Sequence, residues 1–184
     1  MRVEPIVSVT DLESMPDDNN RYEVIDGELF MSKAPGIPHQ RVSMRLTSLI
    51  LRHLAEHPVG EVLATPGVIF SDIDAVIPDL VFIRRERLTE VISGDRIVAA
   101  PDLVIEILSP SPENRRRDRV VKRQLYAKFG VKEYWIIDLE NKQVEVFILK
   151  ERSLDSWATL GVNDTIRSAI LAGFEALVSA VLSL

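Results

Sequence analysis

The sequence contains no cysteine, and this absence removes several kinds of chemistry at once. Disulfides, thiolate zinc sites and cysteine nucleophiles are excluded, so Asp, Glu, His, Lys and Ser remain as the residues for any reaction. No stretch approaches the roughly 18 consecutive apolar residues of a membrane span. The first segment, MRVEPIVSVTDLESMP, has acidic residues and proline where a signal peptide needs an apolar stretch. We therefore expect a cytoplasmic protein.

The chain also lacks an excess of positive charge. It has 22 Lys and Arg against 28 Asp and Glu, which gives a net charge of −6. Such a chain has no global field that attracts nucleic acid, so any nucleic-acid binding would have to rest on a local basic patch. The 184 residues include 46% hydrophobic residues and contain no repeat, low-complexity tract or interdomain linker. We therefore expect one domain over residues 1–184.

Helical and extended patterns follow one another along the chain. The segment 39–56 has apolar residues at helical spacing, and the segment 115–129 lacks helix breakers before Gly130, a suitable left-handed terminator. Asp26-Gly27 favours a tight hairpin turn. The other expected elements are a short capping-box helix at 11–15, hairpin strands at 22–25 and 28–31, strands of one sheet at 61–64, 68–70, 77–83, 97–99 and 103–108, a second hairpin of 133–139 and 143–150, and a helical tail at 173–184.

One carboxylate interrupts an aliphatic strand. In PDLVIEILSPS, Glu106 is the one polar side chain between Leu103 and Leu108. Period-two alternation puts Glu106 on the strand face that also carries Val104, so this side chain does not simply face bulk water. An ionised carboxylate in apolar surroundings is strongly unfavourable unless it is paired, hydrogen-bonded or bound to a metal. Glu106 therefore needs a partner.

A second carboxylate, Asp79, stands inside the aliphatic run AVIPDLVFI, directly after a proline. Two acids on neighbouring central strands could meet at one end of a sheet and share a divalent cation. Oxygen ligands of this kind suit Mg²⁺ or Mn²⁺ and not zinc. The alternative is that each acid is a strand-end residue that is hydrogen-bonded to a loop or paired with one of the many arginines.

The helix expected after Glu106 is rich in cations, in the stretch NRRRDRVVKRQ at 114–124. A charge run on a helix is usually a solvated face, and this interpretation is favoured for most of these arginines. Lys122 is different because Val121 and Leu125 flank the apolar side of the helix. Its stem can therefore pack while its ammonium reaches over the strand end toward Glu106.

Together these segments resemble a known family. YEVIDGEL, HQRVS, PDLVF, PDLVIEILSPS and RRDRVVKRQLYAKFGVKEYWIID are similar to the motifs of the Uma-two family of bacterial restriction endonucleases, a branch of the PD-(D/E)xK nuclease superfamily. The resemblance covers roughly residues 20–150, and its most specific parts are EILSPS and the spacing of Lys122, Tyr126, Gly130-Val131 and Glu133-Tyr134-Trp135. It implies a restriction-endonuclease-like α/β fold, in which a mixed β-sheet with an N-terminal hairpin is flanked by α-helices.

The resemblance also implies a catalytic site. Asp79 and Glu106 would be the acids that bind Mg²⁺ or Mn²⁺, which would polarise the scissile phosphate and activate a water molecule. Lys122 would stabilise the developing charge or orient that water. Two residues after Glu106 the sequence has Leu108 where the superfamily has lysine, so the resemblance places the lysine on the following helix.

Further residues match family positions that line the same cleft. Glu28 would be an additional ligand and His39 would contact phosphate or the metal shell, although a hairpin glutamate is ordinarily solvated and His39 could be an N-terminal helix residue. Arg115, Arg116 and Arg119 would supply a local phosphate track that the overall acidic charge does not.

Two functions remain open from the sequence. The first is a metal-dependent endonuclease acting on DNA, and the second is a catalytically silent domain that kept the nuclease fold for binding nucleic acid or protein. The set Asp79, Glu106 and Lys122 favours the first. The missing global positive charge favours the second. A homodimer is compatible with the first function, because cutting both strands of a duplex generally takes two active sites.

Overall fold

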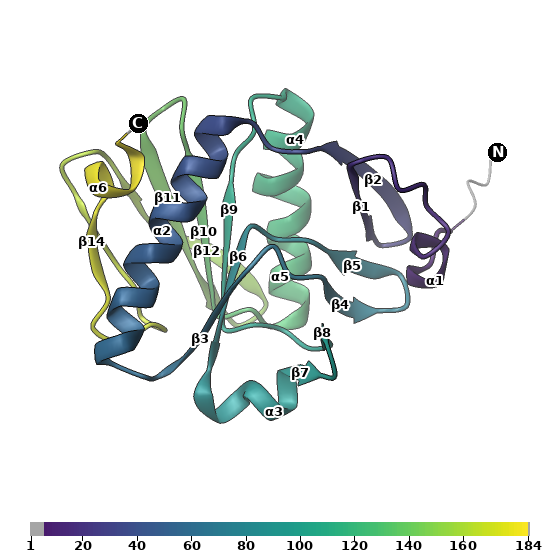
Figure 1. The fold of residues 1–184 in the computed structure, drawn as a ribbon, viewed down its shortest axis with the longest axis horizontal. Helices are drawn as coiled ribbons and strands as arrows, with labels where there is room; N and C mark the ends of the chain where they lie inside the picture. The colour runs from purple at the N-terminus through teal and green to yellow at the C-terminus, as the bar shows by residue number, and fades with distance from the viewer. Residues whose placement is uncertain (1–5, 184) are drawn as a thin grey trace.

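The computed structural model describes residues 6–183 and has a mixed α/β architecture built around two sheets (Figure 1). The central sheet has the strand order β12-β11-β10-β9-β6-β3. Its strands are β3 (Gly60–Ala64), β6 (Leu80–Arg84), β9 (Leu103–Ile107), β10 (Glu133–Asp138), β11 (Gln143–Lys150) and β12 (Ser153–Leu160). β9 and β10 run parallel and every other pair is antiparallel, so the sheet is mixed as predicted.

Helices cover both faces of this sheet. Alternate side chains of β9 point to opposite faces and pack with different helices. Leu103, Ile105 and Ile107 pack in one core with the apolar stripe of α2 (Ile37–Glu56). Val104 and Leu108 pack in the other core with α5 (Arg123–Phe129). Glu106 therefore points into the α5 side, as the period-two pattern predicted.

A second sheet carries the amino-terminal hairpin, in the order β2-β1-β5-β4-β8-β7. Its strands are β1 (Asn20–Ile25), β2 (Glu28–Lys33), β4 (Val68–Ser71), β5 (Asp74–Val76), β7 (Ile92–Ser93) and β8 (Arg96–Ile97). Asp26 and Gly27 have φ of 49° and 77°, which is the tight turn expected between β1 and β2.

The prediction of a single sheet was wrong. The strand predicted at 77–83 begins only at Leu80, as β6 of the central sheet, while the preceding strand β5 ends at Val76 in the hairpin sheet. Pro78 has no N–H to donate to a ladder, which explains the break. Asp79 therefore lies at the junction of the two sheets.

The helix after β9 is continuous but not uniform. α4 (Pro112–Arg116) runs into a π-helical segment, Arg117–Lys122, which continues as α5. Gly130 ends α5 in the left-handed conformation, with φ of 87°, as predicted. This single rod of helix, 112–129, crosses the α5 side of the sheet beneath the end of β9 (Figure 1).

Both ends of the chain differ from expectation. The first helix is α1 (Val9–Leu12), capped by Ser8 and Asp11, two residues before the predicted capping box. The tail predicted as helix at 173–184 is instead β14 (Glu175–Leu177) followed by α6 (Val178–Leu182), and Leu184 lies outside the described residues. The remaining elements are β13 (Thr165–Arg167), which pairs with β14, α3 (Leu88–Val91) and the 3-10 turn Arg85–Arg87. Within residues 6–183, none of the helices has the length and apolar character needed to cross a bilayer.

Candidate active site

An open pocket of about 420 Å³ lies where the two sheets meet. It is bounded by β1, the end of β2, the start of α2, the end of β9, and the helix 112–129. Asp79, Glu106, Lys122 and His39 all line it. The structure thus brings together the three predicted catalytic residues, although β6, β7 and β8 lie between Asp79 and Glu106 in the sequence.

Asp79 is held at the edge of this pocket by three groups. One oxygen, Oδ2, accepts the backbone N–H of Ile107 at 2.8 Å and lies 3.0 Å from Nε2 of His39, while Oδ1 lies 3.5 Å from Arg21. Burial by itself would raise the pKa of Asp79, but the hydrogen bond and charge of His39, the Ile107 N–H and the charge of Lys122 hold that pKa below its usual value. Asp79 is therefore a carboxylate over the ordinary pH range.

Glu106 lies deeper, on the neighbouring strand. Its Oε1 accepts hydrogen bonds from Lys122 Nζ at 2.9 Å and from the hydroxyl of Tyr126 at 2.7 Å. Burial raises the pKa of Glu106 to about 8; the attraction of Lys122 lowers it, and the charges of Asp118, Asp79 and Glu23 raise it further. Glu106 is thus poised to exchange a proton close to neutral pH.

Lys122 is the cation that joins these acids. Its side chain is only 2% exposed, and Nζ lies 2.8 Å from Glu23 and 3.9 Å from Asp118 in addition to its contact with Glu106. Burial would lower the pKa of Lys122, but the three carboxylates outweigh it and raise that pKa above its usual value. Lys122 therefore keeps its proton and acts as a fixed positive charge.

The π-helical segment explains why three charged side chains of one helix point into the pocket. Arg117, Asp118 and Lys122 are all buried. Wider i→i+5 hydrogen bonding brings residues five apart, such as Arg117 and Lys122, closer to the same side than an α-helix would. Arg117 lies 3.6 Å from Glu23 and 3.5 Å from Asp118. We call the six residues Glu23, Asp79, Glu106, Arg117, Asp118 and Lys122 the pocket cluster.

The pocket cluster offers the donor chemistry of a hard divalent cation. It contains four carboxylates, two of which, Glu23 and Asp118, each have a buried oxygen without a hydrogen-bond partner. Against them stand two buried cations, Lys122 and Arg117, so the buried charge has an acidic excess that a divalent ion would balance. In the arrangement observed, no three Asp, Glu or His side chains among residues 6–183 converge as a ligand set, and Lys122 occupies the space between the acids.

The other predicted site residues lie in different surroundings. His39 is at the pocket, but Glu28 is exposed at the start of β2 and outside the pocket lining, so the prediction that it shares the cleft was wrong. Glu28 pairs with Ile25 at the turn end of the hairpin, whereas the buried Glu23 pairs with Phe30 further from the turn.

The predicted phosphate track is largely engaged with protein. Arg115 contacts Asp138 at 2.8 Å and Glu140 at 2.8 Å, and Arg119 contacts Asp138 at 2.6 Å and also Glu145. Arg116 is exposed. We call the five residues Arg115, Arg119, Asp138, Glu140 and Glu145 the Asp138 cluster. It lies on a different side of the helix 112–129 from the pocket cluster.

Comparison with known proteins identifies the family of this chain. The model of the Uma2 family, described as putative restriction endonuclease, matches residues 9–181. The chain belongs to the Uma2 family. None of the curated proteins matches it.

Comparison with solved structures gives two matches of different strength. A nuclease described as putative and assigned to DUF820, from Anabaena variabilis, superposes with a TM-score of 0.78 at 19% identity, covering 96% of this chain and 98% of that one. The type IIG restriction endonuclease BpuSI gives a TM-score of 0.42 at 13% identity, over 82% of this chain and 16% of that one. The first likeness shows that this Uma2 chain shares its overall fold with the DUF820 protein.

Sequence reasoning missed several residues of this candidate site. Glu23, Arg117 and Tyr126 all touch the buried charges, and none was assigned a role. A signal for Glu23 was present: it is a carboxylate between Tyr22 and Val24 in an apolar strand, the same anomaly that singled out Glu106. The burial of Arg117 had no such signal, because it depends on the π-helical segment.

Proposed function

We propose that this protein is a metal-dependent endonuclease that hydrolyses phosphodiester bonds of DNA. The observation that carries the proposal is the pocket cluster: four buried carboxylates gathered around a buried lysine at an open pocket. Buried charge of this kind disfavours folding unless it is fully compensated, and strongly perturbed acids in a pocket are typical of catalytic sites. The description of the family as restriction endonucleases supports DNA as the substrate.

Asp79 and Glu106 are the proposed ligands of Mg²⁺, or of Mn²⁺, because both ions take carboxylate oxygens. A bound ion would supply Lewis acidity toward the scissile phosphate and lower the pKa of a coordinated water. Lys122 holds a permanent positive charge that can stabilise the phosphate as negative charge develops. His39 lines the pocket and would orient Asp79 through its 3.0 Å contact with Oδ2.

A second function has one observation in its favour. Lys122 already pairs with both Glu23 and Glu106, so these acids are compensated in part by protein alone. That arrangement is what a catalytically silent nuclease fold, used to bind nucleic acid or protein, would retain for stability. The two functions differ in whether the pocket takes up a divalent ion.

The deciding experiment compares the wild type with Glu106→Gln. Mn²⁺ and Mg²⁺ binding is measured by calorimetry, and nicking of supercoiled plasmid is followed in the same buffers. We expect metal binding and nicking in the wild type and the loss of both in Glu106→Gln. The change is nearly isosteric, so the fold is expected to survive.

The matched control is Glu145→Gln, which neutralises a glutamate of the Asp138 cluster. It should bind metal and nick plasmid like the wild type. If the wild type takes up neither ion and leaves the plasmid intact, the endonuclease proposal is wrong and the silent nuclease fold is favoured. If Glu106→Gln retains full nicking, the role proposed for Glu106 is wrong.

A further inference from the structure

The outer face of α2 is unusually basic for an acidic protein. α2 carries Arg41, Arg45 and Arg52, and its one acidic residue is Glu56, at its last position. The whole chain, by contrast, has more acidic than basic residues. The positive charge of this protein is therefore unevenly distributed, and α2 holds a local excess of it.

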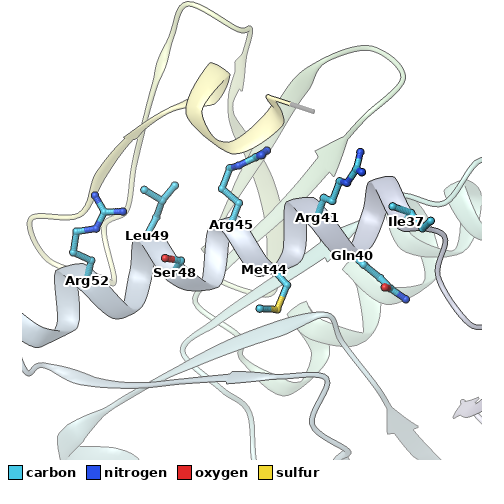
Figure 2. Close-up of a pocket in the computed structure, with 8 residues that line it drawn as sticks. All are labelled: Ile37, Gln40, Arg41, Met44, Arg45, Ser48, Leu49 and Arg52. Carbon is cyan, nitrogen blue, oxygen red and sulfur yellow. The ribbon is translucent and has the colours of Figure 1, made fainter.

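The three arginines form one stripe. Steps of four and seven residues place Arg41, Arg45 and Arg52 along one side of a helix, and Figure 2 shows their side chains projecting from the same side of α2. The stripe borders an open groove of about 610 Å³. From Arg41 to Arg52 the helix rises by roughly 16 Å. A DNA duplex of that length presents roughly five phosphates on each strand.

In the described part of the chain, the charges of these arginines are not engaged by acidic side chains. Among residues 6–183 no carboxylate lies within 4.0 Å of any of the three, whereas Arg115, Arg117 and Arg119 are all paired. Arg41 and Arg52 are exposed. Arg45 donates one hydrogen bond, of 3.3 Å, to the carbonyl of Val181. Unpaired guanidinium groups in a row are suited to a polyanion, since each can bind phosphate in bidentate fashion.

The position of the helix connects the stripe to the pocket. Gly36 and His39, at the start of α2, line the pocket that holds Asp79 and Glu106. Arg41 follows His39 by two residues, which is roughly 3 Å along the axis, and it projects from another side of the helix. A polyanion that lies along the outer face of α2 therefore leads to the end of the helix where the pocket opens.

We propose that the outer face of α2, through Arg41, Arg45 and Arg52, binds the sugar–phosphate backbone of the DNA substrate. The inference rests on the proposed endonuclease function for the choice of DNA as the polyanion. It moves the main phosphate contact away from Arg115 and Arg119, which the Asp138 cluster engages. These contacts are sequence-independent and position the duplex beside the pocket.

The test measures binding separately from cleavage. A short fluorescein-labelled DNA duplex is titrated with protein by anisotropy in EDTA, where no divalent ion is present, over a series of salt concentrations. The R41Q/R45Q/R52Q variant is expected to raise Kd on the order of tenfold to a hundredfold and to reduce the slope of log K against log salt by about 2.7, since each lost phosphate contact removes about 0.9. The double variant R41Q/R52Q, which leaves the bond of Arg45 to Val181 intact, should show about two thirds of the slope change.

The matched control is K132Q/K150Q/R152Q. These three residues are exposed, are absent from the ion pairs of residues 6–183, and lie outside α2, so the control lowers the net charge by the same amount. It should bind DNA almost as the wild type does. Three outcomes would each overturn the inference. The wild type could fail to bind the duplex, the α2 variants could bind like the wild type, or the control could weaken binding as much as the α2 variants do.

The same proteins distinguish this inference from the proposed function. Binding that depends on α2 without plasmid nicking in Mg²⁺ or Mn²⁺ would support the α2 surface and contradict the endonuclease. Plasmid nicking by the wild type, together with α2 variants that bind DNA normally, would support the endonuclease and contradict the α2 surface.

Discussion

One helix serves two charged clusters that differ in how completely their charges are satisfied. The Asp138 cluster surrounds a carboxylate that receives Arg115, Arg119 and the backbone and side chain of Asn141. Both clusters have more acids than cations, but the pocket cluster, on another side of the helix 112–129, leaves buried oxygens of Glu23 and Asp118 without hydrogen-bond partners. The two clusters contain a similar number of ion pairs. They differ in whether every buried carboxylate oxygen has a hydrogen-bond partner.

The pKa values of the central acids express this difference. Burial acts against the charge of Asp138, but the Asn141 N–H, Arg119, the Asn141 side chain and Arg115 hold its pKa at about 2. In the pocket cluster burial prevails and the pKa of Glu106 rises to about 8. Complete compensation thus lowers the pKa of Asp138, whereas incomplete compensation leaves the pKa of Glu106 raised. Asp79, at the edge of the pocket cluster, keeps a lowered pKa, because its burial is outweighed by His39, the Ile107 N–H and Lys122.

The largest expected effect comes from removing one cation from each cluster. Lys122→Met leaves Glu23 and Glu106 buried without their shared partner, and we expect the free energy of unfolding to fall by about 3 to 5 kcal/mol. Arg119→Met removes a side chain that is 29% exposed, and its partner Asp138 retains Arg115, so the loss should be nearer to about 1 kcal/mol. Urea denaturation of both variants at pH 7 measures the two losses. Equal losses would show that the two clusters do not differ energetically.

The pH dependence of stability should differ in sign between the clusters. Glu106 holds its proton more tightly in the folded state, so the stability it contributes is present below its ordinary pKa of 4.5 and is lost as pH rises toward 8. Asp138 contributes stability above its ordinary pKa of 3.8 that is lost as pH falls toward 2. A single carboxyl changes the unfolding free energy by up to about 1.4 kcal/mol per pH unit within its window.

Urea midpoints measured between about pH 5 and pH 8 test this prediction, with the window set by the pKa of Glu106. The wild-type midpoint should fall across that range, and Glu106→Gln should flatten the fall. Asp138→Asn should not change this decrease of the urea midpoint. It should instead remove the part of the acid destabilisation that comes from protonating Asp138. A wild-type midpoint that rises with pH over this range would contradict the raised pKa of Glu106.

The smallest expected effect compares two buried tyrosines. The hydroxyl of Tyr126 donates to Glu106 at 2.7 Å, and that of Tyr134 donates to the carbonyl of Asp118 at 2.9 Å. Replacing either by Phe should lower the unfolding free energy by about 1 kcal/mol. Tyr126→Phe should also move the pH-dependent fall upward, because the ionised form of Glu106 loses a hydrogen bond. The same upward shift in Tyr134→Phe would mean that Tyr126 has no specific effect on Glu106.

The core of the site could be predicted because its signals are local. Strand alternation fixed the face on which Glu106 lies, and the apolar neighbours of Lys122 indicated that its stem is buried. The contact of Lys122 with Glu106, at 2.9 Å, confirms both predictions. The break in the sheet before Asp79 could also have been read from Pro78, which cannot donate to a ladder.

The remainder could not be predicted, because it depends on contacts between distant segments. Glu23 and Glu106 are 106 − 23 = 83 positions apart and meet only because the hairpin sheet packs against the central sheet. A pattern with a period of 3.6 residues gives no indication of where a helix widens, so it predicted Arg117 on the solvated face with its neighbours. The strand β14 takes the place of the first part of the helix expected at 173–184, because it pairs with β13, a segment with no strong pattern of its own.

The ion pairs on both sides of the helix 112–129 also fix its rotation about its own axis. Arg115 and Arg119 tether it to β10 and β11, whereas Arg117 and Lys122 tether it to β1 and β9. Turning the helix to shorten the contacts on one side would lengthen those on the other. The direction in which Lys122 projects from the helix is therefore set during folding. Its ammonium group is held in the pocket before any ligand enters.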